Sequence, residues 1–78
     1  MKTYRSQIYV QDKQGNTPKG IRVSLSFDGF LGGISKPFYT DSNGVAIIEH
    51  ASKGKATVYV RGNTKGTFNA PGEKVVFI

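Results

Sequence analysis

The amino-acid sequence predicts a single all-β domain of about seven short strands that spans residues 1–78. Apolar and polar residues alternate with a period of two along several segments, which places each set on one side of a sheet. Sequences rich in Gly, Asn and Asp separate these segments at roughly ten-residue intervals. No window carries apolar residues at the spacing of an ordinary helix. The pattern is typical of a β-sandwich or a small barrel.

The first two predicted strands show the alternation most clearly. In residues 6–10, Ile8 and Val10 share one face. In residues 20–27, polar residues alternate with a regular apolar set, namely Ile21, Val23, Leu25 and Phe27. Residues 12–20 contain Gly, Asn and Pro and are predicted to form the loop between them.

The middle of the chain predicts a tight hairpin. Residues 38–40 and 45–48 flank the sequence Asp41-Ser42-Asn43-Gly44, whose Asn-Gly pair supplies the positive-φ positions that such a turn requires. The segment 45–48 is apolar on both parities, so the pattern leaves its inward face open.

The last three strands are predicted near residues 55–61, near Thr64 and at residues 74–78. In the first of them Ala56, Val58 and Val60 alternate with polar residues. Turns are expected at residues 62–63 and 70–72. Pro37 and Pro71 are expected at strand ends or edges, since Pro donates no hydrogen bond to a ladder.

Composition excludes several classes of protein. The chain has no Cys, which rules out a disulfide scaffold and a Cys-based zinc fold. No apolar run approaches the roughly 18 residues that span a bilayer, so we expect no membrane insertion. The start of the chain shows no secretory signal peptide, which is either absent or already removed. The sequence leaves the compartment open: the chain is expected to be either cytoplasmic or a fragment of an envelope protein.

Chemistry-bearing residues are few. His50 is the only His, and its place at the end of an apolar strand predicts a solvent-facing residue. Three of the five acidic residues fall in predicted turns, where Asp12 and Asp41 are expected to bond backbone amides. The glycine-rich segment 29–33 lacks the Gly-Lys-Ser/Thr ending of a phosphate loop, and residues 41–44 do not fit a calcium loop. We therefore expect no enzyme, no metal and no cofactor.

Four motifs occur in order along the chain: VQDKQG at 10–15, PKGIRVSL at 18–25, TDSNG at 40–44 and GKATVYV at 54–60. Their order resembles the carboxypeptidase regulatory-like, or transthyretin-like (prealbumin-like), domain family. The resemblance implies a seven-stranded antiparallel β-sandwich of Greek-key, immunoglobulin-like type. It places the strands that start near Lys36, Gly20, Gly54 and Thr64 in one sheet. The strands near Val45, Ser6 and Lys74 form the other.

The resemblance also raises a covalent alternative. Related surface-protein domains form an isopeptide bond between Lys and Asn or Asp with the help of a buried Glu. The residues of this chain do not match that placement, so Glu49 is expected to be solvated or paired with a Lys, and the intact mass to equal the sequence mass.

Net charge is the remaining functional signal. The chain carries 11 Lys+Arg against 5 Asp+Glu, a formal net charge of +6. In the sheet that the resemblance implies, alternation leaves a candidate partner-binding face on the outside, formed by Arg22, Tyr39, Tyr59, Arg61 and Lys65. The glycine-rich loop with Phe30 and Leu31 is a second candidate surface. Tyr and Arg are enriched at protein interfaces.

These residues predict a non-enzymatic binding or structural module, an accessory domain for protein or glycan recognition or for assembly. The alternative is a basic sheet face that binds single-stranded nucleic acid, since such binders combine cations with exposed aromatic rings.

Overall fold

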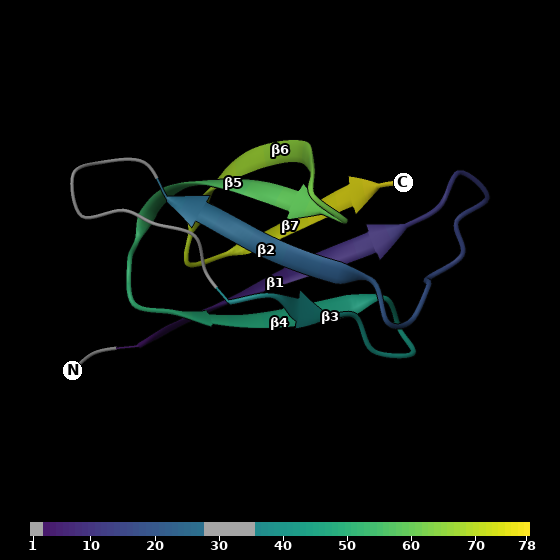
Figure 1. Ribbon diagram of the computed structural model, residues 1–78, viewed down its shortest axis with the longest axis horizontal. Helices are drawn as coiled ribbons and strands as arrows, with labels where there is room; N and C mark the ends of the chain where they lie inside the picture. The colour runs from purple at the N-terminus through teal and green to yellow at the C-terminus, as the bar shows by residue number, and fades with distance from the viewer. Residues whose placement is uncertain (1–2, 28–35) are drawn as a thin grey trace.

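The structure is a computed structural model that describes residues 3–27 and 36–78. Its elements are seven strands: β1 (Tyr4–Gln11), β2 (Arg22–Phe27), β3 (Phe38–Tyr39), β4 (Val45–His50), β5 (Gly54–Val60), β6 (Asn63–Ala70) and β7 (Glu73–Phe77). They form a three-stranded sheet in the order β4-β1-β7 and a four-stranded sheet in the order β3-β2-β5-β6. In Figure 1, β2 of the four-stranded sheet crosses in front of β1 and β7. The described part of the chain contains no helix that is long and apolar enough to cross a membrane.

The grouping of strands into two sheets is the one that the sequence resemblance implies, but the prediction of an entirely antiparallel arrangement is wrong. β1 and β4 are antiparallel, whereas β1 and β7 are parallel, with Gln7 opposite Glu73 and Gln11 opposite Phe77. Between β1 and β7 the chain passes through all the other strands, and it returns to β7 from the four-stranded sheet through the turn at 71–72. Parallel pairing requires such a crossover connection.

The two sheets share one hydrophobic core. Period-two alternation directs its residues inward from both sheets: Ile8, Val10, Ile21, Val23, Leu25, Phe27, Ala46, Ile48, Ala56, Val58, Val60, Ala70 and Val76 are buried. The sequence pattern leaves the inward face of β4 open. In the structure Ala46 and Ile48 face the core, while Ile47 faces solvent. Phe38 is half-buried and packs against the core from the sheet edge.

The hairpin predicted across residues 38–48 is wrong, because β3 and β4 belong to different sheets and, of the Asn43-Gly44 pair, Gly44 alone has positive φ. The predicted bonds from Asp side chains to backbone amides are present in both Asp-x-x-Gly turns. Asp12 Oδ1 accepts hydrogen bonds from the amides of Gln14 and Asn16, at 2.9 and 2.8 Å. Asp41 Oδ1 accepts the corresponding bonds from the amides of Asn43 and Val45. A further bond from the Asn16 side chain, together with these backbone amides, holds the pKa of Asp12 below its ordinary value. Both carboxylates are therefore committed to turn formation.

Candidate functional site

The outer face of the four-stranded sheet carries the predicted binding residues of β2, β3 and β5. Arg22 lies opposite Tyr39, and Ser24 lies opposite Tyr59, so the four side chains form two adjacent cross-strand pairs. Arg22 is exposed, Tyr39 is 60% exposed and Tyr59 is half-buried. The structure thus brings together Arg22, Tyr39 and Tyr59 on one surface, which we name the basic face.

A hollow of about 370 Å³ lies on the basic face and is lined by Arg22, Ser24, Tyr59 and Gly62. Its wall therefore combines a guanidinium group, a hydroxyl group and an aromatic ring. Gly62 adds no side chain and leaves room at the end of the sheet where β5 turns into β6. This combination can accept an anionic group and an apolar group side by side.

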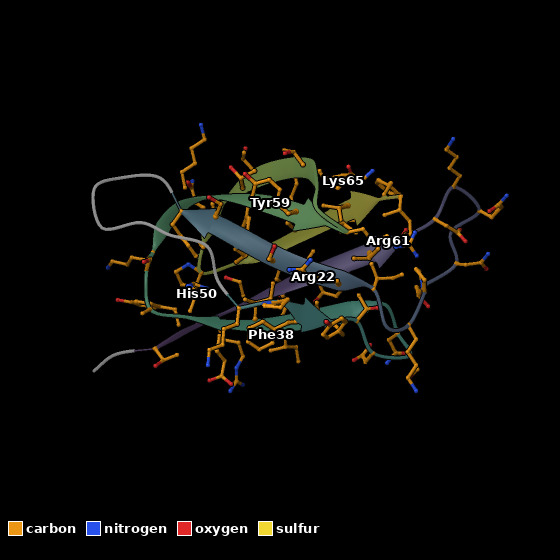
Figure 2. The ribbon with its side chains drawn as sticks, viewed as in Figure 1. Arg22, Phe38, His50, Tyr59, Arg61 and Lys65 are labelled. Atoms are coloured by element: carbon orange, nitrogen blue, oxygen red, sulfur yellow. The ribbon has the colours of Figure 1, made fainter. Side chains whose placement is uncertain are left out.

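Alternation places Arg61 and Lys65 at regular outward strand positions, but the structure places them beside the basic face, in a turn and at a register shift. Arg61 is in the turn after β5, with φ 53°, and its backbone N–H donates to Arg22 O at 3.0 Å. Lys65 falls at a register shift, because Val58 pairs with Gly66 and Tyr59 pairs with Thr64. Alternation fails at both residues because neither one belongs to the regular ladder. Both side chains are exposed, and Figure 2 shows them toward the end of the sheet where β5 and β6 join.

The remaining outward strand positions of this sheet are polar or basic. They are Ser26, Lys55, Thr57, Thr64, Thr67 and Asn69. Among the described residues, no acidic side chain occupies an outward strand position of the four-stranded sheet. The second candidate surface, Phe30 and Leu31, lies outside the described residues.

His50 is not solvent-facing, which corrects the sequence prediction. It is 6% exposed, because the alternation of β4 continues to its last residue and points the ring inward with Ala46 and Ile48. The imidazole lies between the rings of Tyr4 and Phe27, with centroid distances of 6.1 and 5.0 Å.

A buried polar network satisfies both nitrogens of His50. Nδ1 lies 2.6 Å from the carbonyl oxygen of Ser52, so this nitrogen carries the proton that the carbonyl accepts. Nε2 lies 2.8 Å from Ser6 Oγ, and this oxygen accepts a bond from the Gly72 amide at 3.2 Å. Ser6 is fully buried. The network connects β1, the end of β4 and the turn before β7.

The outer face of the three-stranded sheet has a different character, which sequence reasoning missed. Ile47, Val75 and Phe77 are 45%, 46% and 58% exposed on this surface, which we name the apolar face. Glu49 and Glu73, the two Glu of the sequence, are exposed on the same face. The alternation of Glu73, Val75 and Phe77 about the buried Val76 was the available signal. It was hidden because residues 75–78 are apolar on both parities.

Tyr9 also belongs to the apolar face, on the opposite side of the molecule from Tyr39 and Tyr59. It lies between Val45 and Val75 in the ladder, and its hydroxyl donates to Gln7 Oε1 at 2.7 Å. Partial burial raises the pKa of Tyr9 above its ordinary value, and the nearby Glu73 carboxylate, 3.3 Å away, raises the pKa further.

Comparison with known proteins does not assign the chain to a family. The sequence matches no protein-family model and no curated protein. Within residues 3–27 and 36–78, no group of three or more His, Cys, Asp or Glu side chains is placed to hold a metal ion.

Proposed function

We propose that the protein is a non-enzymatic binding module whose basic face binds an acidic protein surface. The observation that carries the proposal is the hollow lined by Arg22, Ser24 and Tyr59, on a sheet face where none of the described strand residues is acidic. A carboxylate placed over Arg22 gains a charge-assisted hydrogen bond, and an apolar side chain beside it covers the ring of Tyr59.

The exposure of the aromatic rings favours a protein partner over a nucleic acid. Single-stranded nucleic acids bind by stacking successive bases on exposed rings. Tyr39 is 60% exposed, but Tyr59 is half-buried and contributes to the wall of the hollow. Arg22 and Ser24 of β2 lie between the two Tyr strands. The face offers a pocket for a side chain more readily than a row of stacking platforms.

The transthyretin-like assignment is part of the proposal. The four ordered motifs and the division into sheets β4-β1-β7 and β3-β2-β5-β6 support it. Domains of that family are generally accessory modules that support a catalytic domain, anchor to envelope polymers or mediate assembly.

The experiment uses three fluorescent probes: a peptide of alternating Glu and Tyr, a sulfated oligosaccharide and an oligothymidylate. Their affinities are measured by anisotropy at low and moderate salt. We expect the peptide to bind most tightly, and Arg22→Gln to weaken its binding by about fivefold or more, the effect of one important interface residue.

Arg5→Gln is the matched control, because Arg5 is an exposed strand Arg on the opposite face and the charge change is the same. Equal losses in the two variants would mean that the peptide responds only to net charge, which would refute the site. Tighter binding of oligothymidylate with a steep salt dependence would replace the proposal with the nucleic-acid alternative.

A further inference from the structure

The two outer faces of the molecule differ in charge as well as in hydrophobicity. On the apolar face, outward strand positions carry two carboxylates, Glu49 and Glu73, and one cation, Arg5. On the basic face they carry Arg22 and Lys55 without a carboxylate, and the exposed Arg61 and Lys65 lie beside them. The faces lie on opposite sides of the shared core. The molecule therefore has one acidic, apolar side and one basic, aromatic side.

The apolar face has the features of a docking surface. Of the four large apolar residues that are most exposed in the described part of the chain, Ile47, Val75 and Phe77 lie on it. The hydroxyl of Tyr9 is held by Gln7 and Glu73, so the centre of the face is ordered before any partner arrives. The exposed apolar side chains lie on the edge strands β4 and β7, on either side of the outward residues of the central strand β1.

We propose that the partner of the basic face is the apolar face of a second copy of this chain. The proposal rests on the proposed function, because it names the acidic surface that the basic face binds. The carboxylates of Glu49 and Glu73 on one copy would meet Arg22 and its cationic neighbours on the next. The fourth large apolar side chain with high exposure, Tyr39, would pack against the apolar face of the next copy.

The charges favour this contact over a symmetric one. Two apolar faces brought together would place four carboxylates against two Arg5 side chains, and two basic faces would place only cations together. A contact between unlike faces leaves one basic and one apolar face free at the ends of every pair. Because the faces lie on opposite sides of each molecule, association continues as a row of copies instead of closing as a dimer.

The experiment uses two variants that each block one face. Arg22→Glu reverses the charge of the basic face, and Glu73→Lys reverses the charge of the apolar face. Sedimentation equilibrium of the unmodified chain, from micromolar to millimolar concentration, is expected to show a mass that rises continuously beyond the dimer. Each variant alone is expected to associate at least tenfold more weakly.

An equimolar mixture of the two variants is the decisive sample. The Glu73→Lys chain keeps a basic face and the Arg22→Glu chain keeps an apolar face, and the two reversed charges are complementary to each other, so the mixture is expected to restore the association that each variant alone has lost. Ile47→Lys serves as a second block of the apolar face if Glu73→Lys does not give a folded chain by circular dichroism.

Three results would overturn the inference: an unmodified chain that stays monomeric at millimolar concentration, an Arg22→Glu chain that associates as tightly as the unmodified chain, or a mixture that associates no more tightly than either variant alone. Binding of the Glu-Tyr peptide is measured independently on the dilute protein. A monomeric chain that binds the peptide through Arg22 would refute self-association and leave the proposed function standing.

Discussion

Gly44 and Gly15 occupy the same position in the two Asp-x-x-Gly turns, yet their surroundings differ. Both have positive φ, 75° and 85°. A Cβ added at Gly44 would lie 2.7 Å from Val10 O and 2.8 Å from the Cβ of Thr17, whereas nothing lies within 4 Å of a Cβ added at Gly15. Gly44 is therefore required by conformation and by space, and Gly15 by conformation alone.

Substitutions at the two positions separate the effect of backbone conformation from the effect of space. We expect Gly15→Ala to lower the free energy of unfolding by about 1–2 kcal/mol, the cost of a left-handed conformation. Gly44→Ala carries the same cost and also forces β1 and its loop away from the turn, so its loss is expected to be about twice as large. Urea unfolding measures both. Equal losses would show that β1 yields to the added methyl group without cost.

Ser6 and His50 form a polar network that the sequence pattern did not reveal. Ser6 Oγ serves two partners, His50 Nε2 and the Gly72 amide. Ser6→Ala would leave the buried His50 Nε2 and the partly buried Gly72 amide without this partner, so we expect it to lower stability by about 1–3 kcal/mol. Ser24→Ala is the matched control, since Ser24 is half-buried on the outer face, and its effect is expected to stay within about 0.5 kcal/mol.

His50→Phe completes a double-mutant cycle, because Phe keeps the ring between Tyr4 and Phe27 while it removes both nitrogens. The double variant is expected to lose less stability than the sum of the two single variants. Additive losses would mean that the two residues do not depend on each other.

At the scale of elements, the sequence predicted the strands whose two faces differ and missed what depends on contacts between strands. The apolar sets of β2 and β5 were correctly directed inward. The sequence did not predict which face of β4 points into the core, because Ala46 and Ile47 are both apolar. Pairing with β1 places Ala46, and not Ile47, on the inward face. The parallel pairing of β7 and the bulge at Lys65 arise from contacts between strands, which alternation does not encode.

The same limit applies to the candidate site. Arg22, Tyr39 and Tyr59 were placed correctly because they sit in regular strands. Arg61 was assigned to a strand face because its parity continues that of Thr57 and Tyr59, whereas the turn begins one residue earlier than alternation suggests. The apolar face was missed because exposure of Ile47, Val75 and Phe77 contradicts the rule that apolar residues are buried.

The turn between β5 and β6 offers a prediction at this scale. Arg61 and Gly62 both have positive φ, as in a type I′ hairpin turn, for which Asn-Gly is the preferred pair. Arg61→Asn keeps the backbone bond to Arg22 O and removes the unfavourable conformation of Arg, so we expect a gain of about 0.5–1 kcal/mol. Thermal unfolding measures the gain. Arg5→Asn, in the interior of β1, is the control and is expected to lose stability.

At the scale of the whole molecule, folding and the proposed recognition use opposite parities of the same strands. Inward positions of both sheets form the single core, while outward positions give one basic and one apolar face. A chain of 78 residues without Cys must bury its apolar residues efficiently to be stable. Apolar residues left outside, such as Phe77, are the ones that the proposed contact between copies would cover.

The shared core predicts that the two sheets unfold together. Ile48 is fully buried and Ile47 is 45% exposed at the next position of β4, so the pair offers a matched test. Ile48→Ala is expected to lower the free energy of unfolding by about 2–5 kcal/mol, and Ile47→Ala by less than about 1 kcal/mol.

Native-state hydrogen exchange of the dilute protein shows where the loss is felt. Because Ile48 belongs to the same core as Leu25 and Val58 of the other sheet, the most protected amides of β2 and β5 should lose as much protection as those of β1. A loss confined to β1, β4 and β7 would mean that the three-stranded sheet opens by itself. The four-stranded sheet, with its basic face, would then be the stable unit, and a row of copies that depends on both faces would come apart wherever the apolar face opened.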